Sequence, residues 1–383
     1  MRMERTYLRL LLVILAVFCA CSIGAHAQSG SRPSPSPTPK SEDQEPIRVF
    51  TEEVRLPIAA TDTYGHYDPT LTSDDVLVLE DGQQQQIKSI QHQPANVLLL
   101  LDVGNQLGLK DTNLTRDVAM RVINSLFAGT QIGVMQFAMK PELLQTWTTD
   151  KSGIVRVLKT KMISGKSSRL SDAIAAAAEQ FKGTPAGTRH IVIVSDGVDT
   201  PGGKVTMTNA LKQLNSIQAS VHILSYTVLA RQELETQTKI WRPGDGIQRD
   251  GNPGSNPVAN GDPTLPPTAT RTPTFKIGSI DTDVAMRRKR KEYERATRQS
   301  EKQLTEIAEE SGGRIFLPTN SNELLAQDES IARDIGSQYV VTYRPTRPLA
   351  AAKPGEYRKV EVASRRVGLY LRSRRGYVVP DNQ

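Results

Sequence analysis

Cysteine is almost absent from this sequence of 383 residues. Both cysteines, Cys19 and Cys21, lie close to the N-terminus. The rest of the chain therefore cannot build a thiolate zinc site, an iron–sulfur cluster, a thiol nucleophile or a disulfide framework. Aromatic residues are also scarce, at 5%, whereas hydrophobic residues make up 38% and charged residues 23%. This composition supports a globular core and leaves room for long polar connectors.

The first segment has the three-part pattern of a secretory signal peptide. Three arginines precede an uninterrupted run of twelve apolar residues, Leu10–Cys21. The segment Ala25–Ala27 then supplies small residues at the two positions that signal peptidase recognises. The run is shorter than the roughly 20 apolar residues of a membrane-spanning helix. We therefore predict a signal peptide over residues 1–27 and export to the periplasm or the medium. A lipid anchor at Cys21 is the alternative.

Two different patterns follow the leader. Residues 28–46 include Pro33, Pro35, Pro37 and Pro39 in alternation with serine and threonine, which is typical of an extended linker that buries no core. Over residues 47–93 apolar residues alternate with polar ones, and Asp81-Gly82 between two apolar runs indicates a hairpin, because both turn positions need a positive φ. Similar short strand patterns recur over residues 339–380. A β module of about 45 residues is marginal alone, so we expect the N-terminal and C-terminal strands to pack together.

The segment from residue 94 to residue 338 alternates predicted strands with predicted helices. Continuous apolar runs such as Val97–Leu101 and Ile191–Val194 predict strands that are covered on both faces. This alternation predicts a doubly wound, mostly parallel sheet. Between residues 242 and 276 proline, glycine, asparagine, aspartate and threonine dominate, and we expect a disordered insertion over about residues 231–285. Ser321 is expected to cap the last helix.

Two aspartates follow predicted strands of this segment. Asp102 comes directly after Val97–Leu101, and Asp196 comes directly after Ile191–Ser195. Ligands of doubly wound sheets bind at the carboxyl ends of the strands, where the strand order reverses. If these are the first and fourth strands of the sheet, the reversal lies between them. We therefore expect both carboxylates to converge on one crevice.

The residues around these aspartates resemble the von Willebrand factor type A domain. The resemblance rests on Asp102-Val103-Gly104-Asn105-Gln106, on Ser195-Asp196-Gly197 and on the surrounding alternation of strands and helices. The flanks are similar to a narrower group, the acidobacterial VWFA-related proteins, and the likeness covers roughly residues 47–230 and 300–378. It implies a VWA-like α/β domain flanked by a small β module. The flanking motifs that carry it are residues 71–86, 311–316, 338–343 and 374–377.

The resemblance also implies a metal-ion-dependent adhesion site on three loops. The family pattern is Asp-x-Ser-x-Ser in the first loop, a threonine in the second and an aspartate in the third, which are hard oxygen ligands suited to Mg²⁺. Asp102 and Asp196 match the two aspartates, and Ser168 falls on the threonine, but Gly104 and Gln106 replace both serines. We therefore expect a degenerate site at these five positions that binds Mg²⁺ weakly if at all, and no other cofactor. The alternative is that the aspartates only cap loops and helix starts by hydrogen bonding.

The sequence contains no grouping that indicates an enzyme. Its histidines form no metal-spaced pair, and none accompanies a Gly-x-Ser-x-Gly nucleophile turn. The run Arg287–Lys302 holds eight basic and three acidic residues but only one aromatic, Tyr293, which favours a solvated helical face over a nucleic-acid site.

We therefore expect an exported, non-enzymatic protein-binding module of the adhesion type. Its expected partner is a protein ligand, with no nucleic acid and no transmembrane segment, and association with the cell envelope is compatible with the basic segments. Two alternatives remain open. One is an envelope-associated enzyme subunit, and the other is attachment to an anionic surface polymer through the basic segments.

Overall fold

The computed structural model describes residues 53–105, 112–184, 186–238, 284–353 and 355–379. The predicted signal peptide and linker lie outside these residues, as do Gln106 and residues 239–283 of the expected insertion. In this described part, no helix is both long enough and apolar enough to cross a membrane.

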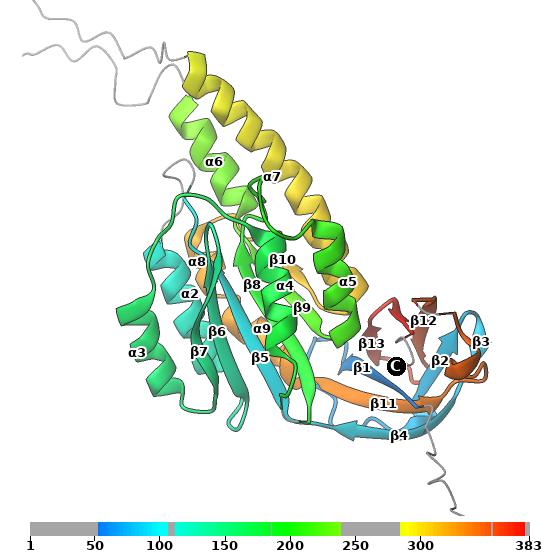
Figure 1. Cartoon of the computed structure of the whole chain (residues 1–383). Coiled ribbons are helices and arrows are strands. Elements are labelled where there is room, and N and C mark those ends of the chain that lie inside the picture. The colour runs from blue at the N-terminus through cyan, green and yellow to red at the C-terminus, as the bar shows by residue number, and fades with distance from the viewer. Residues whose placement is uncertain (1–52, 106–111, 185, 239–283, 354, 380–383) are drawn as a thin grey trace, which may run out of the picture. The chain divides into compact units, whose positions relative to one another are not determined.

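A six-stranded sheet forms the centre of an α/β unit (Figure 1). The spatial order is β10-β9-β8-β5-β6-β7, and all neighbouring strands are parallel except β6 and β7. The chain order therefore reverses between β5 and β8, which confirms the doubly wound, mostly parallel sheet. The strands are β5 (Ala95–Asp102), β6 (Gln131–Phe137), β7 (Pro141–Thr148), β8 (Thr188–Ser195), β9 (Ser220–Ser225) and β10 (Ile315–Phe316).

Strand β5 shows why the sheet needs helices on both faces. Val97, Leu99 and Leu101 pack into one hydrophobic cluster, whereas Leu98 and Leu100 pack into the cluster on the opposite face. All five side chains are fully buried. A run of apolar residues with alternating directions is stable only where both faces of the strand are covered.

Helices cover both faces of this sheet (Figure 1). Helices α2, α3, α8 and α9 contribute to the cluster on one face, and α4, α5 and α7 contribute to the other, while α6 packs beside α7. The bounds are α2 (Thr112–Ser125), α3 (Lys151–Lys161), α4 (Leu170–Gln180), α5 (Met207–Ile217), α6 (Thr227–Thr238), α7 (Val284–Ser311), α8 (Ser321–Leu325) and α9 (Asp328–Gly336).

Two expectations need correction. The insertion was expected to begin at residue 231, but α6 continues to Thr238, because Ala230 and Leu234 give this polar segment a narrow buried stripe against α7. The last helix is in fact two helices, and the cap of α8 is Asn320, whose side chain accepts a hydrogen bond from the backbone N–H of Glu323 at 2.9 Å. Ser321 is the first residue of that helix.

A β module joins segments from both ends of the described chain, as expected. Strand β1 pairs antiparallel with β11, and β2 pairs antiparallel with β12. The predicted turn between β2 and β3 is confirmed, since Asp81 and Gly82 have φ values of 48° and 79°. One sheet contains β13 (Tyr370–Ser373), β1 (Val54–Thr61), β11 (Gln338–Arg344) and β4 (Gln86–His92); the other contains β14 (Gly376–Val378), β12 (Tyr357–Ser364), β2 (Val76–Glu80) and β3 (Gln83–Gln84). Short 3₁₀ turns are η1 (Ser73–Asp75) and η2 (Leu349–Ala351).

A buried ion pair links the N-terminal and C-terminal segments of this module. Arg358 of β12 donates to Glu80 of β2 at 2.9 Å, and the hydroxyls of Tyr343 and Tyr377 donate to the other oxygen of Glu80 at 2.8 and 2.9 Å. All four residues are buried. The guanidinium of Arg358 also donates to the backbone carbonyls of Arg347 and Pro348. Because a buried charge is costly unless it is paired and hydrogen-bonded, this network depends on every member.

We expect Arg358→Met to lower the free energy of unfolding by about 3–5 kcal/mol, because it keeps most of the side-chain volume but leaves Glu80 without its buried cation. Urea denaturation measures the change. The matched control is Arg375→Met, which removes an exposed arginine paired with Glu309 and Glu310 and should cost at most about 1 kcal/mol. Equal costs for the two variants would contradict the prediction.

A second buried polar cluster lies at the amino ends of β8 and β9. His190 and His222 are fully buried and stacked, with ring centroids 5.6 Å apart. Asp334 of α9 lies 3.8 Å from His222 and forms ion pairs with Arg372 at 3.0 Å and Arg314 at 3.3 Å. Burial lowers the pKa of His190 well below its ordinary value. Burial, with the nearby cations of Arg372 and Arg314, lowers the pKa of His222 to about 3.

We expect the free energy of unfolding to fall as the pH is lowered from about 6.5. In this range the unfolded chain binds a proton at each imidazole and the folded chain does not, so the stability is complete above the unfolded pKa. It is then lost at up to about 1.4 kcal/mol per pH unit for each histidine as the pH falls toward the folded pKa. Urea denaturation at several pH values measures the slope. His222→Gln should reduce it, and His66→Gln, at an exposed position, should not. An unchanged slope in His222→Gln would contradict this assignment.

Candidate functional site

Asp102 and Asp196 lie at the carboxyl ends of two neighbouring strands. Asp102 is the last residue of β5, Asp196 directly follows β8, and the two strands pair in parallel where the strand order reverses. Both side chains are fully buried. The structure therefore brings the two aspartates to one edge of the sheet, as the sequence predicted.

The carboxylate of Asp102 joins three segments of the chain. One oxygen accepts the hydroxyl of Ser168 at 2.5 Å and the backbone N–H of Gly104 at 3.0 Å. The other oxygen accepts the hydroxyl of Ser195, the last residue of β8, at 2.6 Å. Ser168 and Ser195 are also fully buried. Asp102 thus holds the first loop, the second loop and the end of β8 together with charge-assisted hydrogen bonds.

Gly104 stands where the family pattern has a serine, and the structure gives a steric reason. A Cβ atom at this position would lie only 2.5 Å from the carbonyl of Ser167 and closer still to the hydroxyl oxygen of Ser168. The first and second loops touch here through a parallel bridge between Gly104 and Gly165. The backbone N–H of Gly165 donates to Val103 at 2.8 Å. Because a side chain has no space at position 104, the close contact of the two loops requires glycine.

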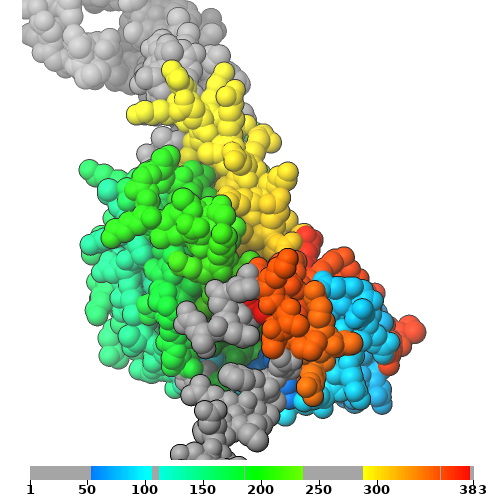
Figure 2. Space-filling model, turned by 45° about the vertical axis from the view of Figure 1, so that its right-hand side comes forward, coloured from blue at the N-terminus to red at the C-terminus, as the bar shows by residue number. Residues whose placement is uncertain are grey.

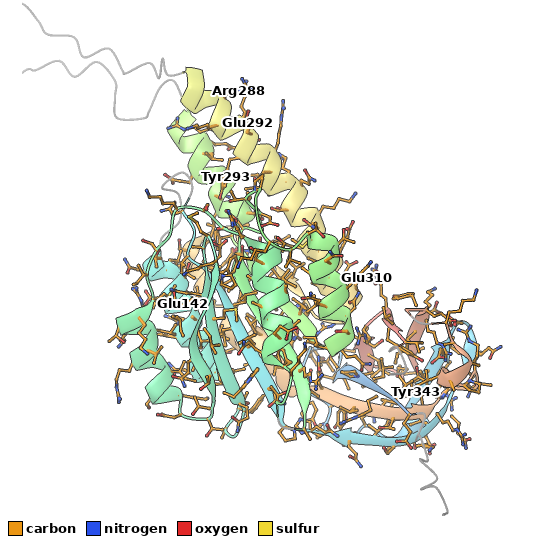
Figure 3. All side chains as sticks on the ribbon, viewed as in Figure 1. Glu142, Arg288, Glu292, Tyr293, Glu310 and Tyr343 are labelled. Carbon is orange, nitrogen blue, oxygen red and sulfur yellow. The ribbon has the colours of Figure 1, made fainter. Side chains whose placement is uncertain are left out.

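The carboxylate of Asp196 is held by the third loop and by helix α7. One oxygen accepts the backbone N–H of Val198 at 3.0 Å, and the other accepts the hydroxyl of Tyr293. The hydroxyl of Ser300, two turns further along α7, donates to the backbone carbonyl of Asp196 at 2.6 Å. Figure 3 labels Tyr293 on α7. Burial and the neighbouring carboxylate of Asp196 raise the pKa of Tyr293 far above its ordinary value, so the hydroxyl keeps its proton and acts as a donor.

Tyr293 is the site residue that sequence reasoning missed. In the sequence it is the single aromatic residue of the basic run, and it carries no motif. A weak signal exists, since Tyr293, Ser300 and Leu304 are spaced to share one face of a helix. All three are buried. A second tyrosine, Tyr226, directly follows β9, and burial together with Asp102 and Asp196 raises its pKa well above the ordinary value.

The described residues do not fit a divalent metal ion. Mg²⁺ requires a near-octahedral set of oxygen ligands, but the oxygens of Asp102 accept the serine hydroxyls, and those of Asp196 accept Val198 and Tyr293. Gly104 offers no side-chain oxygen, and Gln106 lies outside the described residues. In the part of the chain that the structure describes, no cluster of three or more His, Cys, Asp or Glu side chains is placed to hold a metal.

Comparison with known proteins gives a family match for this unit. The model of the von Willebrand factor type A domain matches residues 97–198. Similar solved structures include a von Willebrand factor type A protein from Catenulispora acidiphila, with 9% identity over 83% of this chain and 76% of that chain and a TM-score of 0.41. An aerotolerance-related membrane protein from Bacteroides fragilis has 18% identity over 63% and 98% of the two chains and a TM-score of 0.36.

Another similar structure is proximal thread matrix protein 1 from the mussel byssus with a zinc-occupied MIDAS motif, that is, a metal-ion-dependent adhesion site. It has 15% identity over 35% of this chain and 39% of that chain and a TM-score of 0.31. No curated protein matches the chain. The matched residues 97–198 run from β5 through β8 into the third loop and include Asp102, Ser168 and Asp196. The α/β unit of this chain therefore has a VWA-like fold, and residues 97–198 within it match the von Willebrand factor type A domain.

Proposed function

We propose that this chain is an exported, non-enzymatic protein-binding module whose binding face is the carboxyl end of the central sheet. The observation that carries the proposal is the way Asp102 joins the first loop, the second loop and the end of β8. These hydrogen bonds hold the described part of the face in place, and a preorganised surface loses little conformational entropy when it binds a partner. The leader-like segment 1–27 supports the exported part of the proposal.

The side chains around these loops favour a protein as the ligand. Ile163 and Met139 are exposed apolar residues, and Lys140 and Lys166 are exposed close to them in sequence. The second loop is joined to the end of β6, because the N–H of Ile163 donates to the side chain of Gln136 at 3.1 Å. Exposed apolar residues with a charged surround are typical of protein-binding surfaces. The lysines favour a partner with acidic residues at the edge of the contact.

The hydrogen bonds of the two aspartates support the non-enzymatic part of the proposal. A general acid or base must exchange a proton with a substrate, which requires an accessible atom within hydrogen-bonding reach. Asp102 and Asp196 are instead fully buried, and both oxygens of each carboxylate accept hydrogen bonds from the protein. In this proposal their role is to position the loops.

We expect the substitution Ile163→Asp to abolish capture of partner proteins from cell-envelope extract, because it places a charge on an exposed apolar residue of the proposed contact. Ile163 is 69% exposed, so its replacement should leave the fold intact. Immobilised wild-type protein and variants are compared by pulldown and mass spectrometry, with and without a chelator. Capture by the wild type should not depend on the chelator.

The matched control for this experiment is Val367→Asp. Val367 is also an exposed apolar residue, at 101% relative exposure, but it lies in the β module. This variant should capture the same proteins as the wild type. If Ile163→Asp captures them equally well, the carboxyl end of the sheet is not the binding face.

A second candidate function rests on the outer face of α7. Five exposed basic residues recur at alternating intervals of three and four, which places them on one face of the helix over roughly 20 Å. Arg288 and Arg298 also pair with Glu292 and Glu294 on the same helix. The outer surface of α7 is uncovered in Figure 2. Such a row of charges favours attachment to an anionic polymer. The five residues are Arg288, Lys291, Arg295, Arg298 and Lys302.

For this second candidate, we expect the triple substitution Lys291→Glu, Arg295→Glu and Lys302→Glu to lower the salt concentration at which the protein elutes from a heparin column. The interaction is electrostatic and is therefore screened by salt. A control with the same change in net charge reverses three exposed residues of α3, Arg156, Lys159 and Lys161. Equal losses in the two triple variants would show that only the net charge matters and would contradict a specific site on α7.

A further inference from the structure

Helix α7 reaches the third loop at three successive points along one face. Tyr293 donates its hydroxyl to the carboxylate of Asp196, and Ser300 donates to the backbone carbonyl of the same residue. One turn further, Leu304 packs against Gly197, where a Cβ atom would lie 2.6 Å from the Leu304 side chain. Gly197 has a φ of 69°, which favours glycine. The third loop is therefore shaped to the surface of α7.

The position of Tyr293 is determined by the pairing of α6 with α7. The ring packs with Val198, Ala230 and Leu234 in a small hydrophobic cluster of its own. A polar contact fixes the same pair of helices, because Glu301 of α7 forms an ion pair with Arg231 of α6 at 2.6 Å. Both helices extend beyond the carboxyl edge of the sheet (Figure 1). Tyr293 is only 6% exposed, so the packing between the two helices holds its hydroxyl against Asp196.

The carboxylate of Asp196 in the third loop thus has a hydrogen-bond donor, the hydroxyl of Tyr293, that the family pattern does not contain. In that pattern a cation lies at the aspartate of the third loop, whereas here the neutral hydroxyl of Tyr293 donates a hydrogen bond to it. A buried carboxylate needs strong donors, and a tyrosine hydroxyl in an apolar surround forms such a charge-assisted hydrogen bond. We propose that the hydroxyl of Tyr293 takes the place of the metal ion at Asp196. The adhesion site of this domain then keeps its structure without a metal ion.

The first test is the stability of Tyr293→Phe, which removes the hydroxyl and keeps the ring in its hydrophobic cluster. We expect the equilibrium constant for unfolding to rise roughly 10- to 100-fold, because Asp196 loses a charge-assisted hydrogen bond in a buried position. Tyr370→Phe is the control, since Tyr370 is exposed in the β module, and its effect should stay within about twofold. Unchanged stability of Tyr293→Phe would overturn the proposal.

The second test asks whether the hydroxyl occupies the place of a cation. The melting temperature is measured with a chelator and with millimolar Mg²⁺ or Mn²⁺. We expect the wild type to be indifferent to all three, because hydrogen bonds from the protein already satisfy Asp102 and Asp196. Stabilisation of the wild type by Mn²⁺ would overturn the proposal, because ligand binding to the folded state raises its stability.

A measurement on the wild type keeps the proposal testable if Tyr293→Phe does not fold. Hydrogen exchange follows the backbone N–H of Val198, which donates to Asp196. Its protection should be the same with chelator and with Mn²⁺, because the hydroxyl of Tyr293 already closes the site. Protection that rises on addition of Mn²⁺ would show that a cation completes the site and would overturn the proposal. None of these measurements depends on a protein ligand, so their outcome is separate from that of the pulldown.

Discussion

The hydrogen bonds to the buried carboxylate of Asp102 determine how the top of the central sheet is built. A carboxylate at this depth is tolerated only when donors surround it. Ser195 is supplied by the neighbouring strand, and Ser168 by a loop that must come close enough to reach it. That approach leaves no space for a side chain at Gly104. The glycine at position 104 and the packing of the second loop therefore have one structural cause.

The β module contains a similar arrangement, in which hydrogen-bond donors surround the buried carboxylate of Glu80. Its donors come from Tyr343, Arg358 and Tyr377, which lie on three different strands of the C-terminal segment. In both places one carboxylate connects segments that are far apart in sequence. Groups of this kind contribute less to net stability than their contacts imply, because desolvation offsets the attraction. Their effect is that any packing of the chain that leaves such a carboxylate without one of its donors is less stable.

Much of the fold could be predicted because the signals were local. The apolar runs before Asp102 and Asp196 required strands that are covered on both faces, and the doubly wound order then made the two aspartates neighbours. Tyr293 could not be found in this way. It lies on a polar helix beyond residues 239–283, and its contact with Asp196 depends on how α7 packs against α6. The edge strand β7 was missed because few of its side chains are buried, so its sequence shows little apolar pattern.

The pairing of β1 with β11 and of β2 with β12 has a consequence for the order in which the chain is completed. Synthesis proceeds from the N-terminus, so the first strands exist long before their partners. Until the final segment emerges, β1 and β4 lack the strands with which they pair, and β2 pairs only with β3. The intervening α/β unit can fold first and bring its own two ends close together, which shortens the effective loop that the last strands must close. Assembly of the β module therefore requires strands that lie on both sides of the α/β unit in the sequence.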